Sequence, residues 1–204
     1  DEYRFFEPNK NFECIEFKGE KIAVTICEDI WNIDNANPMY SICPMDFLIK
    51  ENPTLMINLS ASPFSYQHAD IRKEIVKENC LKYNLPMIYC NSVGAQTEII
   101  FDGGSMACDA QGHSICSLKY FEEDYAVVDL NQSSQPSSHS ENWGRYERKH
   151  KALVLGIRDF FQKSGFQKAI LGLSGGIDSA LTLAIAVEAL GSKNVLSVLM
   201  PSEY

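Results

Sequence analysis

Residues 55–91, LMINLSASPFSYQHADIRKEIVKENCLKYNLPMIYCN, join two short apolar runs through a stretch with helical spacing. The first run, residues 55–59, is typical of a buried strand, and Pro86 separates the helical stretch from the second run, MIYCN. Over residues 68–83 the apolar side chains recur as on one face of a helix, at Ile71, Ile75, Val76, Cys80 and Leu81. A strand, a helix and a strand in this order predict a layered α/β fold.

The flanking segments extend this fold in both directions. On the N-terminal side, residues 14–17 and 21–27 predict a hairpin that leads into a buried strand, and a helix is expected from about Pro44 to Lys50. On the C-terminal side, residues 97–130 predict a meander of short strands, EIIF, SMACD, SICSLK and YAVVDL, with turns at DGG and AQG. Strand and helix alternation followed by a meander indicates a partly antiparallel sheet.

A polar segment divides the chain. Residues 131–144, NQSSQPSSHSENWG, are rich in Ser, Gln and Pro and poor in apolar side chains, as linkers are. We therefore predict a first domain over residues 1–130, a linker over 131–146 and a second domain over 147–204.

The second domain is predicted to begin with an amphipathic helix. This helix carries Leu153, Ile157 and Phe160 on one face and ends at Gly165. A strand (AILGL), a Gly-rich turn (SGG), a helix over about residues 177–190 and a strand (VLSVLM) follow. These elements predict one βαβ unit of a parallel sheet.

Composition and charge exclude several classes of protein. The chain has 204 residues, 45% of them hydrophobic and 22% charged, which is typical of a globular protein. A formal net charge of −9, with no basic stripe, argues against nucleic acid and anionic membranes as partners. No apolar run reaches the roughly 20 residues of a membrane span. Seven cysteines without a CxxC pair favour reduced thiols in a cytoplasmic protein.

The most specific motif is LGLSGGIDSALTLA, residues 171–184. A buried strand runs into Ser174, Gly175 and Gly176, whose backbone N–H groups can point at an anion, and the following helix directs its positive end to the same point. Asp178 and Ser179 can cap the helix, hold Mg²⁺ or bond phosphate oxygens. No GKS or GKT follows the glycines, so the motif is not a Walker loop. An ordinary Gly-rich turn is the alternative.

This motif resembles the PP-loop signature of ATP pyrophosphatases, enzymes that adenylate a substrate and release pyrophosphate. The resemblance implies ATP and Mg²⁺ as cofactors, with Asp178 as the metal-binding residue, and places the adenine near the end of the following strand. It implies ATP contacts by the residues Gly172, Leu173, Ser174, Gly175, Gly176, Ile177, Asp178, Ser179 and Met200.

A second motif, AVTICEDIW, residues 23–31, places Cys27 at the end of an apolar run and next to Glu28 and Asp29. Adjacent carboxylates raise the pKa of a thiol, whereas a nucleophilic cysteine needs a lowered one. Cys27 is therefore either a buried core thiol or a nucleophile whose activating groups come from elsewhere in the protein.

ICEDIW, INLSASPF and YCNSVGAQTEIIFDGGS together resemble the carbon–nitrogen hydrolase (nitrilase) superfamily, and most closely the glutaminase domain of the glutamine-dependent NAD⁺ synthetase family. By resemblance, Cys27 attacks the glutamine side-chain amide, forms a γ-glutamyl thioester and frees ammonia. The resemblance further implies that Glu28 and Trp31 line the glutamine pocket and that Ser62 bonds the substrate. Many members of the family carry a Lys or Arg six positions after that serine. Here His68 occupies the position, with Arg72 one turn further on, and either could meet the substrate carboxylate.

The resemblance implies a partial nitrilase-type αββα sandwich followed by the first βαβ unit of a PP-loop domain. It implies ATP-dependent amidation of deamido-NAD⁺ with ammonia from glutamine, by a homo-oligomer. The family's general-base Glu and oxyanion Lys precede the cysteine, and we expect both upstream of this chain, which alone should turn over neither substrate. Two alternatives remain: an amidase of the same superfamily, whose ATP-pyrophosphatase-type domain acts on another substrate, and a noncatalytic piece that packs or binds partners.

Overall fold

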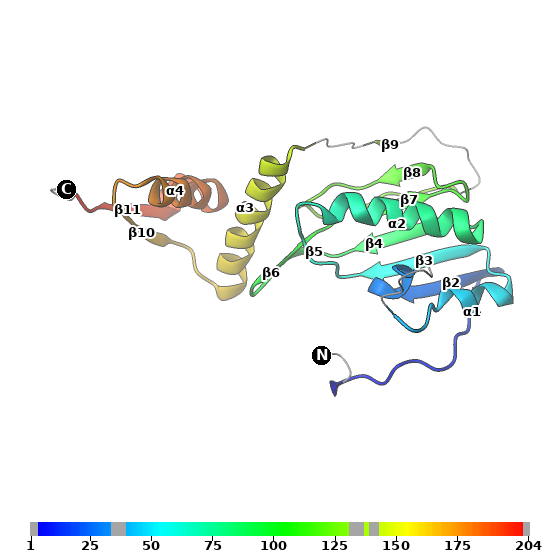
Figure 1. The fold of residues 1–204 in the computed structure, drawn as a ribbon. Coiled ribbons are helices and arrows are strands. Elements are labelled where there is room, and N and C mark those ends of the chain that lie inside the picture. The colour runs from blue at the N-terminus through cyan, green and yellow to red at the C-terminus, as the bar shows by residue number, and fades with distance from the viewer. Residues whose placement is uncertain (1–3, 34–39, 131–136, 139–142, 202–204) are drawn as a thin grey trace.

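The computed structural model describes residues 4–33, 40–130, 137–138 and 143–201 (Figure 1). Most of the predicted linker therefore lies outside the described residues. Within the described residues, no helix combines the length and the apolar character that crossing a membrane requires.

A seven-stranded sheet forms the first part of the molecule, in the order β1-β2-β3-β4-β7-β8-β9 (Figure 1). Strands β2, β3 and β4 pair in parallel, β1 pairs antiparallel with β2, and β7 pairs antiparallel with β4 and β8, as the mixed pattern predicted. The short strand β9 pairs in parallel with β8. The bounds are β1 Ile15–Phe17, β2 Glu20–Ile26, β3 Leu55–Ser60, β4 Met87–Asn91, β7 Met106–Cys108, β8 Ser114–Ser117 and β9 Ser137–Ser138.

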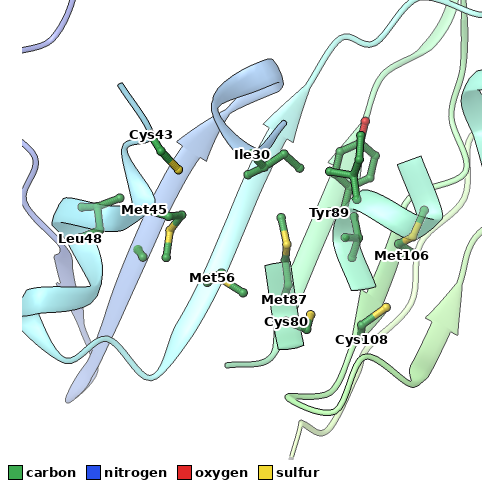
Figure 2. Close-up of a cluster of buried hydrophobic side chains, with 13 residues drawn as sticks. Ile30, Cys43, Met45, Leu48, Met56, Cys80, Met87, Tyr89, Met106 and Cys108 are labelled. Carbon is green, nitrogen blue, oxygen red and sulfur yellow. The ribbon is translucent and has the colours of Figure 1, made fainter. Parts of the chain in front are cut away.

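Helices cover one face of this sheet. The short helix α1, Met45–Leu48, continues into a 3₁₀ turn, Ile49–Glu51, and the long helix α2, His68–Tyr83, ends at Asn84 in the left-handed conformation. Side chains at alternate strand positions meet the helices in one core (Figure 2). Its buried members include Ala23, Met45, Leu48, Met56, Ile75, Val76, Cys80, Met87, Tyr89, Met106 and Cys108.

The opposite face of the central strands is apolar but accessible. Ile26 is 66% exposed and Leu59 is 50% exposed, although both belong to parallel strands. Parallel sheets in α/β proteins are normally covered on both faces. The molecule therefore presents one complete helix layer and one open apolar sheet face, consistent with part of an αββα sandwich.

The meander differs in two respects from the sequence prediction. Strand β5, Val93–Gln96, was not expected; it pairs with β6, Ile99–Asp102, as a separate two-stranded hairpin. The strand predicted at YAVVDL is wrong, because residues 125–130, all of them described, have no strand assignment. In this segment Val128 packs on the core beside β8, whereas Val127 is 96% exposed. The alternation of buried and exposed side chains therefore occurs here without hydrogen-bonded pairing to a neighbouring strand.

Helix α3, Arg145–Ser164, starts the second part of the molecule and ends at Gly165 with φ 73°, as predicted. The face with Leu153 and Phe160 is not the buried one: these two side chains are 49% and 53% exposed, whereas Ala152 and Leu155 are buried. The buried face packs with Phe121 and Ile100 of the first part and with Trp143, just before the helix. A parallel βαβ unit follows, made of β10 Ala169–Leu173, α4 Ile177–Leu190 and β11 Val195–Leu199.

Candidate active site

Cys27 lies at the carboxyl end of β2, where the chain leaves the sheet. Its backbone has φ 48°, in the left-handed region, and it begins a single 3₁₀ turn, Cys27–Ile30. The side chain of Asp29 stabilises this turn by accepting a 2.8 Å hydrogen bond from the Ile26 N–H. Because β2, β3 and β4 are parallel, their carboxyl ends gather here, the usual place for a binding site in such a sheet.

The surroundings of Cys27 do not activate its thiol. Burial, and then the charge of Glu28, raise the pKa of Cys27 above its ordinary value. The neighbouring Ala61 and Glu28 backbone groups and the Ser60 side chain lower the pKa of Cys27, but burial and the charge of Glu28 outweigh them. This agrees with the expectation that an activating base and cation must come from elsewhere.

The residues expected to contact glutamine surround this end of the sheet. Glu28 is exposed, and the Trp31 ring meets the His68 ring edge-on, with 6.1 Å between the centroids. His68 Nδ1 lies 3.1 Å from the Pro63 carbonyl oxygen, at the start of α2. Ser62 is 6% exposed, in the loop that follows β3.

Arg72 does not reach the surface beside His68. Its Nη2 donates to both carboxylate oxygens of Asp102, at 2.7 and 2.6 Å, and its Nη1 lies 3.4 Å from Ser62 Oγ. The Arg72 and Asp102 side chains are 2% and 1% exposed. Of the two residues considered for the substrate carboxylate, only His68 is near the surface and without a charged partner in this arrangement.

A buried polar network continues from this pair to the strand ends. Asn91 Oδ1 accepts from the Ser62 N–H at 3.0 Å, and Asn91 Nδ2 donates to the Gly103 carbonyl at 2.8 Å. Ser60 Oγ donates to Asn58 Oδ1 at 2.6 Å, and Asn58 Nδ2 donates to the Cys27 carbonyl at 3.2 Å.

Sequence reasoning did not select Asn58, Asn91 or Asp102. Asn58 could have been selected from the sequence, because a polar residue at an inward position of a buried strand must have a hydrogen-bond partner. For Asp102, only the three-dimensional meeting of β6 with α2 identifies the partner, Arg72.

A pocket of about 300 Å³ opens on another side of this network. It is bounded by Asn91, by the turn Gly103–Ser105 and by side chains of residues 118–124, including Lys119 and Glu122. None of Cys27, Glu28 and Trp31 lines it. The pocket thus does not mark the predicted glutamine site.

The Gly-rich loop has the geometry that an anion cradle needs. It connects β10 to α4 in three exposed residues, with Gly175 at φ 88° and Gly176 as the N-cap of the helix. Ser179 Oγ donates to the Gly176 carbonyl at 2.9 Å and lies 3.3 Å from Ser174 Oγ. These contacts hold the loop against the first turn of α4, with its backbone open to a ligand.

Met200, the residue expected near the adenine, lies just after β11 and next to the end of β10. The Met200 N–H donates to the Leu173 carbonyl at 3.0 Å, so the end of β11 lies beside the end of β10. A Cβ at Gly172 would come within 2.6 Å of Met200 Cε, so glycine allows this close approach. The structure brings together Gly172, Leu173 and Met200 on one side of the loop.

Among the described residues, no three His, Cys, Asp or Glu side chains form a metal-binding group. Mg²⁺ in nucleotide sites needs only one or two carboxylates because phosphates and waters complete its shell. Asp178, in the first turn of α4, is suitably placed for such a role.

Comparison with known proteins identifies relatives of both parts. The carbon–nitrogen hydrolase family model matches residues 1–137, and the NAD synthase family model matches residues 149–204. The chain is 44% identical to a glutamine-dependent NAD(+) synthetase of Synechocystis and 36% identical to one of Thermotoga maritima. Both alignments cover the whole chain but only 38% and 40% of the relatives.

A solved structure of such a synthetase is also similar to this chain. The glutamine-dependent NAD⁺ synthetase of Acinetobacter baumannii, determined with ADP, superposes with a TM-score of 0.83 at 34% identity. The superposition covers all of this chain and 38% of that protein. The chain thus spans about two fifths of the length of these relatives.

Proposed function

This chain belongs to the carbon–nitrogen hydrolase family, and from that premise we propose that it is part of an enzyme that makes NAD⁺ from deamido-NAD⁺ with glutamine as the nitrogen source. The observation that carries the proposal is the order of the two family matches: a carbon–nitrogen hydrolase segment and then an NAD synthase segment in one chain. Other glutamine-using PP-loop enzymes have a different type of glutaminase.

In the first part, Cys27 is the proposed nucleophile on the glutamine amide. Its position at the carboxyl ends of parallel strands supports this role, as does the left-handed backbone, since strained conformations concentrate at functional sites. Glu28 and Trp31 would line the pocket, Ser62 would bond the substrate, and His68 would face its carboxylate. The raised pKa of Cys27 means that the thiol needs a general base to become a nucleophile.

In the second part, ATP would bind at the loop between β10 and α4. The backbone of Ser174, Gly175 and Gly176 would cradle phosphate oxygens, and Asp178 would hold Mg²⁺. When bound, Mg²⁺ neutralises phosphate charge and orients the leaving pyrophosphate. Leu173, Ile177 and Ser179 would complete the phosphate side, with Gly172 and Met200 toward the adenine. We propose a homo-oligomer as the working form.

The experiment that tests this function uses the full-length protein that contains the chain. With deamido-NAD⁺ and ATP, Cys27→Ala should abolish NAD⁺ formation from glutamine while leaving formation from added ammonium intact. Cys90→Ala, on the same sheet but outside this site, is the matched control and should support both reactions.

Two other outcomes would select the rival functions. Glutamine hydrolysis without ATP turnover stimulated by deamido-NAD⁺ would indicate an amidase whose second domain has another substrate. Absence of both activities in the full-length protein would indicate a noncatalytic role.

A further inference from the structure

The ion pair between Arg72 and Asp102 is buried at the edge of the proposed glutamine site. Arg72 comes from α2 and Asp102 from the end of β6, so the pair joins the helix layer to the separate β5–β6 hairpin. A buried pair gives little net stability because the loss of hydration offsets the attraction between the charges. Its presence therefore calls for an explanation other than stability.

The pair is part of a closed ring of hydrogen bonds. Arg72 Nη1 lies 3.4 Å from Ser62 Oγ, Asp102 Oδ1 lies 3.5 Å from Asn91 Nδ2, and Asn91 Oδ1 accepts from the Ser62 N–H at 3.0 Å. Ser62 is thus held at both its backbone and its hydroxyl group. The short Arg72–Asp102 contacts, at 2.6 and 2.7 Å, fix the pair, and each partner makes one longer contact, to Ser62 and to Asn91.

Arg72 makes its contacts to Asp102 and Ser62 while one of its own N–H donors has no hydrogen-bond partner among the described residues. Arg72 Nε is the one buried side-chain nitrogen or oxygen without a hydrogen bond among the described residues. An unsatisfied buried donor costs free energy. The contacts with Asp102 and Ser62 therefore determine the position of the guanidinium, at the cost of one unsatisfied donor.

The ring reaches Cys27 through the residues next to Ser62. The backbone of Ala61 and the side chain of Ser60 lie beside the Cys27 sulfur, where they lower the pKa of the thiol against the larger, opposite effects of burial and of Glu28. The Ser60 carbonyl accepts from the Ser92 N–H at 2.9 Å, beside Asn91. The loop 60–62 is thus held at Ser62 by the ring and at Ser60 by the Ser92 N–H.

We propose that Arg72 and Asp102 are positioning residues, which hold the loop 60–62 so that Ser62 meets glutamine and the Ala61 N–H meets the Cys27 sulfur. The role in glutamine binding rests on the function proposed above. The effect on Cys27 does not, because it concerns the thiol alone.

The test replaces both charges, in Arg72→Met/Asp102→Leu, so that no unpaired charge stays buried. The control is Asp70→Asn/Arg148→Met, which removes a 2.8 Å ion pair between the same helix and α3; among the described residues, neither side chain is hydrogen-bonded to Ser62 or Asn91. In the full-length protein we measure kcat and KM for glutamine and, by peptide mass spectrometry, the rate of Cys27 alkylation by iodoacetamide from pH 6 to 10.

We expect the KM for glutamine to rise about tenfold, the size of effect given by the loss of one well-placed hydrogen bond. The alkylation profile of Cys27 should move to higher pH, because the thiolate loses the Ala61 N–H. The control should change neither. A merely structural role would lower kcat through a smaller folded fraction and leave KM and the pH profile unchanged, and that result would overturn the proposal.

If the double variant does not fold, Asn91→Ala opens the ring while the ion pair stays in place. An unchanged KM and an unchanged Cys27 profile in folded Asn91→Ala protein would also overturn the proposal. A wild-type protein that does not hydrolyse glutamine would remove the proposed function, whereas the alkylation profiles would still decide whether the pair positions the loop.

Discussion

At the scale of single residues, Cys27 combines an unfavourable backbone with an unfavourable charge environment. Its φ of 48° is costly for any residue with a Cβ, and Glu28 opposes ionisation of the thiol. The combination is consistent with a site at which placement of the sulfur outweighs local stability.

The backbone strain predicts an unusual order of stability for two variants. Cys27→Gly should be more stable than Cys27→Ala by about 1 kcal/mol, since glycine accepts the left-handed conformation without a Cβ clash. Urea unfolding of the two variants measures the difference. Equal stabilities would show that the conformation at residue 27 is not strained.

The charge environment predicts the effect of Glu28→Gln on the thiol. Removing a negative charge that raises the pKa of Cys27 should lower that pKa, so alkylation at pH 8 should become faster. The control Glu78→Gln, on the exposed face of α2, should leave the rate unchanged. A rate unaffected by Glu28→Gln would mean that burial alone determines the pKa.

At the scale of secondary structure, α3 is attached to the β5–β6 hairpin by a two-point contact. Asp159 Oδ2 accepts from the Ala95 N–H at 2.7 Å, and Lys163 Nζ donates to the Ala95 carbonyl. The two side chains satisfy both backbone groups of one strand residue, as a neighbouring strand would.

Asp159→Ala should release this contact. We expect hydrogen exchange of the Ala95 amide to accelerate about tenfold, because its acceptor is lost while the sheet behind it is intact. Glu147→Ala, in the exposed first turn of α3, serves as the control. Unchanged exchange at Ala95 would indicate that water replaces the carboxylate without cost.

The Gly-rich loop offers a matched pair of substitutions. A Cβ at Gly175 meets no atom within 4 Å, so Gly175→Ala tests the φ of 88° alone, whereas Gly176 has an ordinary φ of −80°. Gly175→Ala should destabilise the second part of the chain by about 1 kcal/mol and Gly176→Ala by less. Thermal unfolding of both variants decides, and a larger effect at Gly176 would contradict this account.

The elements themselves were largely predictable from sequence. The helix over residues 68–83 and the strand MIYCN have the predicted bounds because apolar spacing and Pro86 determine them locally. The strand predicted at YAVVDL is wrong, and which face of α3 is buried was not predicted, since both depend on which neighbour covers the segment. The site shows the same dependence. Cys27 could be selected from its sequence motif, whereas the hydrogen-bonded ring around Arg72 could not, because it forms between segments that are distant in the sequence.

At the scale of the whole molecule, the two faces of the main sheet differ in cover. Met56 faces the helices and is 1% exposed, whereas Leu59, on the open face of the same strand, is 50% exposed. The fold of the family accounts for this difference, because an αββα sandwich places a second sheet on the open face.

This asymmetry predicts unequal costs of truncation in the isolated chain. Met56→Ala should destabilise it by about 2–5 kcal/mol, and Leu59→Ala by about 1 kcal/mol or less, because half of the Leu59 surface already contacts water. Denaturant unfolding of the two variants gives both values. A similar loss for Leu59→Ala would mean that the open face is covered in solution, for example by self-association, and sedimentation would then detect it.

The helix-covered core contains four methionines, Met45, Met56, Met87 and Met106, each at most 6% exposed (Figure 2). A thioether is oxidised to a polar sulfoxide only when peroxide reaches it. Oxidant can reach these sulfur atoms only when the helices separate from the sheet. Their rates of sulfoxide formation would therefore report, without any added label, how often and where this interface opens.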